Sequence, residues 1–267
     1  MSGSQDTARY YPAIILAKAV IKQSIRQKEF QLILILMILL LGTGLIAPAI
    51  LKNEGAQTHF FFVNFGLSFA FFCAQFLTLL AAARQYPQEF EQRTILPLMS
   101  KPISRNEYIL GKWLGTTLLG IIAILLLVPL WLISNTITLH IDNDIAMFFQ
   151  MIALQCLAIA SISALAILGS LFMPFALNLG VVAILVFKGQ AIGQFISNFF
   201  DGKLPSDATQ WISNYFPVFR YFDLSNLYSM GEPPIGLSDC LLRLLYGLLW
   251  IAIPMAFAMF GFKRKAL

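Results

Sequence analysis

The chain has 267 residues, of which 58% are hydrophobic and only 12% are charged, and its net charge is +5. Soluble domains carry about twice that share of charged residues, so the composition excludes an ordinary water-soluble globular protein. Apolar runs of about 20 residues, the length needed to cross a bilayer, recur along the sequence. We therefore predict one all-α, polytopic membrane domain over residues 1–267.

The first predicted element is a surface helix within residues 8–29. Lys18, Lys22 and Arg26 recur every four residues, and Leu16 and Val20 lie roughly opposite them. This pattern is typical of a helix on the inner membrane surface, with its cations near anionic lipid headgroups. The alternative is a cytosolic extension of the first transmembrane helix.

Six apolar stretches follow, and each is long enough to cross the hydrocarbon core of a bilayer. The predicted transmembrane helices are residues 31–50, 60–83, 108–134, 146–170, 175–196 and 240–262. Outside them, no segment is large enough to form an independent soluble domain.

The distribution of positive charge predicts the orientation. Most of the 18 Lys and Arg residues precede the first predicted span, lie between the second and third, or follow the sixth. Because such an excess marks the cytoplasmic side, we expect a multi-pass protein of the cell inner membrane with both termini in the cytoplasm. The orientation in the membrane thus accounts for the positive net charge of +5. This charge therefore gives no support to nucleic-acid binding.

Residues 84–112 form the most charged segment between two spans. They are long enough to form structure of their own and are predicted to be a cytoplasmic loop that docks a partner protein. Ser104 followed by Glu107 matches a capping box, in which each residue satisfies a backbone N–H of the other at a helix start. The third span should therefore begin as a capped helix.

The second span carries a polar stripe. Asn64, Ser68, Gln75 and Thr78 fall on one arc of a helix, with a row of Phe residues beside it. Polar amides facing lipid are costly, so the stripe must face protein or a water-filled path. Two interpretations remain open: hydrogen bonding within one protomer, or the lining of a route at a dimer axis.

Residues 189–239, before the last span, are rich in Phe, Tyr and Trp. Aromatic rings favour the depth of the lipid headgroups. The composition therefore predicts short interfacial or re-entrant helices on the outer side, and a structural lid is the alternative.

Motifs for catalysis and metal binding are missing from the sequence. No phosphate-binding Gly-x-x-x-x-Gly-Lys-Ser/Thr loop occurs, since Gly111-Lys112 is followed by Trp113. The three cysteines are scattered and match no metal-site spacing. We expect no cofactor or metal in this chain, and any ATP must bind another polypeptide.

The segment from Glu89 to Lys112 resembles the loop between the second and third spans of type-2 ATP-binding-cassette (ABC) permeases. Arg93 stands where those permeases have Gly, and Pro97 interrupts their Leu-rich turn. The matching positions are Thr94, Ser100, Pro102, Ile103, Ser104, Arg105, Glu107, Gly111 and Lys112.

This resemblance implies the permease subunit of an ATP-driven exporter, which moves a hydrophobic or amphipathic substrate outward. ABC ATPase subunits would bind ATP and Mg, and a second permease copy and membrane lipid would complete the assembly. In the family the loop holds a coupling helix that docks on the ATPase. The implied docking residues are Glu89, Glu91, Arg93, Thr94, Ser100, Pro102, Ser104, Arg105 and Glu107.

In similar permeases the second and fifth spans line the substrate path, which favours the dimer-axis interpretation of the polar stripe. The implied path residues are Asn64, Ser68, Gln75, Thr78, Phe65, Phe72 and Asn178. The alternative function is a non-translocating transmission module that relays ATPase motion to periplasmic partners, for example in metal-site maturation. A secondary transporter is disfavoured because no pair of interrupted, acid-bearing spans is present.

Overall fold

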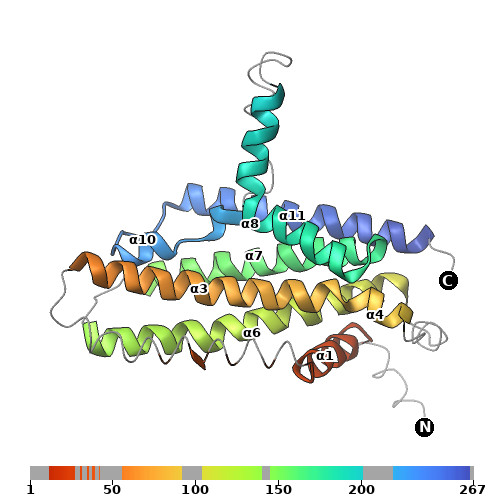
Figure 1. Ribbon diagram of the computed structural model, residues 1–267, viewed down its shortest axis with the longest axis horizontal. Helices are drawn as coiled ribbons and strands as arrows, with labels where there is room; N and C mark the ends of the chain where they lie inside the picture. Colours follow the sequence, from red (N-terminus) through yellow and green to blue (C-terminus); the bar gives the residue numbers. More distant parts are fainter. Residues whose placement is uncertain are drawn as a thin grey trace, which may run out of the picture.

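The computed structural model describes residues 12–27, 56–91, 104–139, 145–200 and 219–264, with a few isolated positions between 31 and 42. Every regular element in these ranges is a helix, and no strand occurs within them. Long helices lie side by side in a bundle (Figure 1). The prediction of an all-α fold is confirmed.

Five of the predicted spans fall within long helices. Four stretches, Phe60–Phe90, Arg105–Pro129, Ile145–Phe172 and Leu237–Phe262, are long and apolar enough to cross a membrane, and Phe175–Gly189 is a shorter apolar one. The predicted span at 31–50 lies largely outside the described residues, so the count of six stays a prediction. The long helices are α3 (Ala56–Ala83), α6 (Arg105–Leu139), α7 (Ile145–Phe172), α8 (Phe175–Phe200) and α11 (Leu237–Arg264).

Helix α7 lies at the centre of the bundle and packs against α3, α6, α8 and α11. Its sequence is apolar all round, as expected for a helix with neighbours on every side. Small buried residues such as Ala158, Ala160 and Ala164 let the neighbouring backbones approach closely. Thr116 on α6 and Ser163 on α7 are hydrogen-bonded, with 2.6 Å between their hydroxyl oxygens.

Helix α1 (Pro12–Ile25) forms within the segment where the surface helix is predicted and packs along α6. Leu16, Ala17 and Val20 are buried, whereas Lys18 and Lys22 are exposed. Gly115 of α6 permits this approach, because a Cβ atom there would lie 2.9 Å from both the Cα and the carbonyl oxygen of Ala17. The cationic face of α1 therefore points away from the bundle.

Three short helices complete the described fold: α4 (Gln85–Glu91), η3 (Phe219–Phe222) and α10 (Ser225–Ser229). Helix α4 lies at one end of the bundle with α1, the start of α6 and the end of α11, and α10 lies at the opposite end (Figure 1). We call these the α4 end and the α10 end. Gly231, with φ of 71°, follows α10 in the left-handed conformation common after helix C-termini.

In the aromatic segment at 189–239, α8 continues to Phe200, beyond its predicted end at residue 196. Figure 1 shows the last part of α8 standing away from the bundle. Short helices η3 and α10 then precede α11, as predicted, and residues 201–218 lie outside the described residues. Whether these elements lie at a membrane interface stays a prediction.

Candidate functional site

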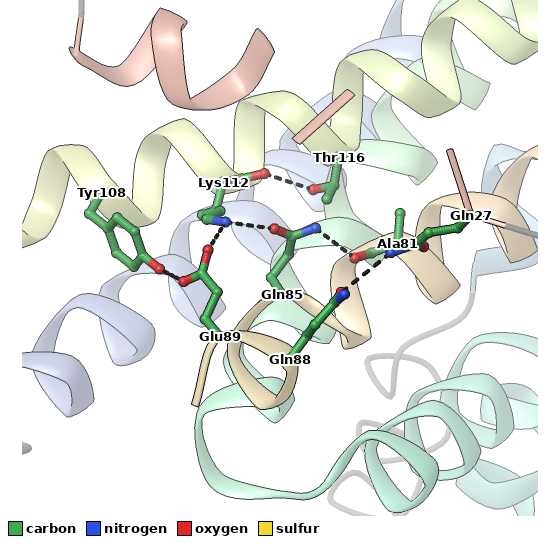
Figure 2. A network of polar contacts seen from close by, with 8 residues as sticks. All are labelled: Gln27, Ala81, Gln85, Gln88, Glu89, Tyr108, Lys112 and Thr116. Atoms are coloured by element: carbon green, nitrogen blue, oxygen red, sulfur yellow. Dashed lines mark hydrogen bonds and ion pairs between the residues drawn. The ribbon is translucent and has the colours of Figure 1, made fainter. Parts of the chain in front are cut away.

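A network of polar side chains joins α4 to α6 at the α4 end (Figure 2). The Lys112 ammonium is ion-paired with Glu89 and donates a hydrogen bond to Gln85 Oε1 at 2.9 Å. The Tyr108 hydroxyl donates to the other oxygen of the Glu89 carboxylate. Gln85 in turn donates from Nε2 to the carbonyl oxygen of Ala81 at 3.0 Å, which ties the network to the end of α3.

Residue spacing brings these groups together. Gln85 and Glu89 are four residues apart on α4, and Tyr108 and Lys112 are four apart on α6. Residues four apart share one face of a helix, so each helix presents a polar pair to the other. The network needs no residue from a loop.

The ion pair is buried, with the side chains of Lys112 and Glu89 only 6% and 9% exposed. Burial of a charge is costly unless the charge is paired and hydrogen-bonded. Here both conditions are met, and removing one partner of such a pair typically costs about 3–5 kcal/mol. The position of α4 relative to α6 is therefore strongly determined.

Aromatic packing extends the same junction to α11. The ring of Tyr86 lies 5.8 Å from that of Tyr108 and 5.6 Å from that of Phe262, and the rings of Tyr108 and Phe262 lie 5.7 Å apart. Arg105 also donates from Nη1 to the carbonyl oxygen of Phe262 at 3.5 Å. Thus the end of α11 is held against α4 and the start of α6.

The start of α6 is a capping box. Ser104 N–H donates to the Glu107 carboxylate at 2.9 Å, and Glu107 N–H donates to Ser104 Oγ at 3.2 Å. This reciprocal arrangement confirms the capping predicted from the sequence. Residues 92–103 therefore leave from one fixed helix, α4, and return to another at a capped helix start.

The contacts of this site hold the ends of α4, α6 and α11 together. Within the described residues, no group of three His, Cys, Asp or Glu side chains is placed to hold a metal ion.

A family model described as "ABC-2 family transporter protein" matches residues 14–267. The chain belongs to this ABC-2 transporter family. No curated protein matches the chain.

Membership makes this ABC-2 protein a multi-pass membrane permease that works with an ABC ATPase subunit. Members are membrane subunits without an ATPase site of their own, in accordance with the missing phosphate-binding loop. The resemblance found in residues 89–112 is thereby confirmed at the level of the family.

The structure places the predicted docking residues in different environments. Glu89 is buried in the α4–α6 network, so its carboxylate lies inside the bundle and not on a surface open to a partner. Glu91 is the last residue of α4, and Ser104 and Arg105 are exposed at the start of α6. Arg93, Thr94, Ser100 and Pro102 lie outside the described residues.

The polar stripe of α3 faces the protomer interior at both of its ends. Ser68 is hydrogen-bonded to Ser225 of α10, with 2.8 Å between the hydroxyl oxygens, and donates weakly to Asn64 at 3.5 Å. Thr78 is fully buried and donates to the carbonyl oxygen of Ala74 at 2.8 Å. Gln75, between them, is half-buried. The hydrogen bonds of Ser68 and Thr78 are thus made within one protomer, which is the first of the two interpretations of the polar stripe.

The Phe row beside that stripe is the more exposed face of α3 and consists of Phe61, Phe65, Phe69, Phe72 and Phe76. Phe65 and Phe72 are 54% and 44% exposed. Asn178, predicted to neighbour the stripe, is instead fully buried against α7, where its Nδ2 donates to the carbonyl oxygen of Ala166 at 2.9 Å. A role for these residues in a substrate path stays a prediction. Asn178 lines a cavity of about 430 Å³ between α7, α8 and α11 and not the polar stripe of α3.

The sequence does not reveal the partners of Glu89. Lys112 is a matching position of the family loop and carries one of its charges, but charges between two spans are expected to lie in water, and nothing in the sequence singles out Tyr108 or Gln85 as a partner. The four-residue spacing of polar groups on both sides of the loop is the signal that would have indicated a buried network.

Proposed function

We propose that this permease is the transmembrane subunit of an ATP-driven exporter in the cell inner membrane. It moves a hydrophobic or amphipathic substrate outward, while a separate subunit binds ATP and Mg and hydrolyses the nucleotide. A second copy of the chain forms the other half of the translocation path.

The buried α4–α6 network is the observation that carries this proposal. Residues 92–103 connect two helices that Glu89, Lys112 and Tyr108 hold together. A partner that displaces this connection moves α4 and α6 together, and α3 follows through Gln85 and Ala81. Rigid-body movement of this kind is how ATPase closure is converted into gating.

Co-purification of the ATPase with the full-length permease tests the docking. Arg105→Glu reverses an exposed charge beside the connection and should abolish co-purification, as should Glu91→Lys at the end of α4. Arg243→Glu, on α11 away from this junction, is the matched control and should leave it intact. Unchanged co-purification in both test variants, with normal membrane insertion, would exclude docking at the α4 end.

Glu89→Gln separates docking from transmission. The carboxylate is buried and ion-paired with Lys112, so its neutralisation should spare the ATPase contact while loosening α4 from α6. We expect normal co-purification together with reduced export for each ATP hydrolysed. Full coupling in reconstituted vesicles would show that the network has no transmission role.

The side of the membrane is tested by thiol labelling in a background without native cysteine. Helices α1 and α4 and the end of α11 share one end of the bundle (Figure 1), which supports the prediction that they face the cytoplasm together. A membrane-impermeant reagent should label Lys22→Cys only in inverted vesicles and Met230→Cys only in right-side-out vesicles. The reverse pattern would contradict the orientation.

The dimer axis is tested by cross-linking. The exposure of the Phe row on α3 supports an arrangement in which this row meets its partner or the substrate path. Phe65→Cys and Phe72→Cys should cross-link between protomers, whereas Thr78→Cys, which is buried, should not. If Thr78→Cys reacts and both Phe positions stay inert, the axis lies elsewhere.

The second candidate is the non-translocating transmission module with a periplasmic partner. The inward hydrogen bonds of Ser68 and Thr78 favour it, because they leave fewer polar groups to line a path. A transported substrate should stimulate ATP hydrolysis by the reconstituted complex, whereas a pure transmission module should respond only to its periplasmic partner. This measurement distinguishes the two functions.

A further inference from the structure

Two cationic side chains line a cavity where α8 meets η3. The cavity has a volume of about 350 Å³, and its lining includes Lys188, Gln194 and Arg220. Within the described residues neither cation is paired with a carboxylate, and no lining residue is acidic. Asp223, the acidic residue nearest in sequence, accepts the N–H of Ser225 at 2.9 Å. The cavity thus presents an excess of positive charge.

Lys188 lies near the end of the apolar stretch Phe175–Gly189, thirteen residues after the start of α8 or about 20 Å along a helix. Its side chain and that of Arg220 are both exposed to the cavity. Two cations that share one cavity repel each other, so an anion bound between them would compensate both charges.

An aromatic surface leads up to the cavity. Five phenylalanines of α3 stand in one row, with successive ring centroids between 6.0 and 6.4 Å apart. Phe72 lies in this row, and its ring is 4.9 Å from that of Phe187, which lines the cavity beside Lys188. These five are the Phe row, Phe61, Phe65, Phe69, Phe72 and Phe76.

The length of the Phe row matters for an elongated ligand. It covers sixteen residues of helix, and its end residues Phe61 and Phe76 are about 22 Å apart along the axis. The cavity meets the row at Phe72, and the eleven residues from there to Phe61 correspond to about 16 Å. An acyl chain that leaves the cavity at Phe72 can therefore follow aromatic rings over about that length.

We propose that Lys188 and Arg220 bind the anionic headgroup of an amphiphile whose apolar chain lies along the Phe row. Arg suits a phosphate or carboxylate because its guanidinium donates two parallel hydrogen bonds, and Lys adds a compact charge. The Gln194 amide supplies a further donor. This inference rests on the proposed export function and names its substrate class, an amphiphile with a negative head and at least one long apolar chain.

Lipid binding to the purified full-length permease tests this site. Dioleoyl phosphatidylglycerol and dioleoyl phosphatidylcholine are each titrated, and bound lipid is counted by native mass spectrometry. We expect phosphatidylglycerol to bind about tenfold more tightly. Lys188→Gln and Arg220→Gln should each remove most of that preference, and Lys188→Arg should retain it. Phe72→Ala should weaken both lipids.

Lys18→Gln is the matched control for charge. Lys18 is exposed on α1 at the α4 end and does not line the cavity, so its loss should not change the lipid preference. Helix content and the size-exclusion profile check that each variant is folded. Inorganic phosphate, which has the charge but no chain, should not displace the lipid at equal concentration.

Several results would overturn the proposal. These are equal affinities for the two lipids, an unchanged preference in both Lys188→Gln and Arg220→Gln, the same loss in Lys18→Gln, or displacement by equimolar phosphate. None of them involves ATP or the ATPase subunit. A negative result in the lipid titration would therefore not contradict ATPase docking at the α4 end. A negative result in the co-purification experiment would likewise not contradict the lipid site.

Discussion

The two ends of the bundle are built from different kinds of contact. At the α4 end, buried and directional contacts hold α3, α4, α6 and α11 together, through the Glu89–Lys112 pair and the Tyr86–Tyr108–Phe262 rings. At the α10 end, η3 and α10 are also buried in the core, but the hydrogen bond that links α10 to α3, Ser68–Ser225, joins two uncharged hydroxyls. We expect the first end to move as a unit and the second to be held less strongly by its polar contacts.

Lysine shows the same difference within one residue type. Lys112 is buried with its charge satisfied by Glu89 and Gln85, whereas Lys188 is exposed in a cavity without a described partner. A buried charge with its partners fixes structure, whereas an exposed cation in a cavity is accessible to an anionic ligand. The comparison therefore separates a region for transmitting force from a region for binding.

Lys112→Met should have the largest effect, because it leaves the Glu89 carboxylate buried without a counter-charge. We expect a loss of about 3–5 kcal/mol in the free energy of unfolding, measured by denaturant titration in detergent. Lys18→Met on the exposed face of α1 should change it by less than about 0.5 kcal/mol.

Adding Glu89→Gln to Lys112→Met should recover part of the loss, since no unpaired charge then remains. A double variant no more stable than Lys112→Met alone would indicate that the pair contributes through packing and not through charge.

Gly115→Ala should have the next largest effect, by pushing α1 away from α6. The added Cβ would meet backbone atoms of Ala17 at 2.9 Å, which cannot rotate aside. Overpacking of this kind costs about 1–3 kcal/mol, and protease cleavage within α1 should become faster.

Gly180→Ala is the matched control for that substitution. No heavy atom lies within 4 Å of the Cβ position at Gly180, so the higher helix propensity of Ala should stabilise α8 by up to about 1 kcal/mol. If Gly115→Ala is equally stabilising, α1 is not held by this close approach.

Ser104→Ala should cost about 1 kcal/mol, because the N–H of Glu107 loses its acceptor at the start of α6. Faster amide hydrogen exchange in the first turn of α6 is the expected readout. Glu107→Gln preserves the reciprocal bond of the capping box and should exchange more slowly than Ser104→Ala. Identical exchange in both variants would argue that the cap does not determine this helix start.

The smallest effect is expected at the α10 end. A double-mutant cycle with Ser68→Ala and Ser225→Ala should give a coupling of about 0.6 kcal/mol, the average for hydrogen bonds between membrane helices. A coupling as large as that of Glu89 with Lys112 would remove the distinction between the two ends.

Local signals predicted the parts of the structure that depend on neighbours in sequence. The long helices follow from apolar length, and the Ser104–Glu107 cap follows from a three-residue spacing that one turn of helix fulfils by itself. These predictions needed no knowledge of the fold.

Contacts between distant segments were not predictable in the same way. The burial of Glu89 depends on α4 folding back against α6, and the hydrogen bond of Ser68 depends on Ser225, 157 residues away. Polarity alone cannot say whether a charged group meets water or a partner, so the sequence left both interpretations of the polar stripe open.

The α4–α6 network also has a consequence for synthesis of the chain. Glu89 and Lys112 are 23 residues apart, so their pair can form once α6 has left the ribosome. Arg105 and Phe262 are 157 residues apart, and their contact must wait for the last helix. Because N-terminal parts generally fold first during translation, we expect the α3–α4–α6 hairpin to enter the membrane as an early intermediate. Its Tyr86 and Tyr108 rings would then form the surface on which α11 docks to complete the protomer.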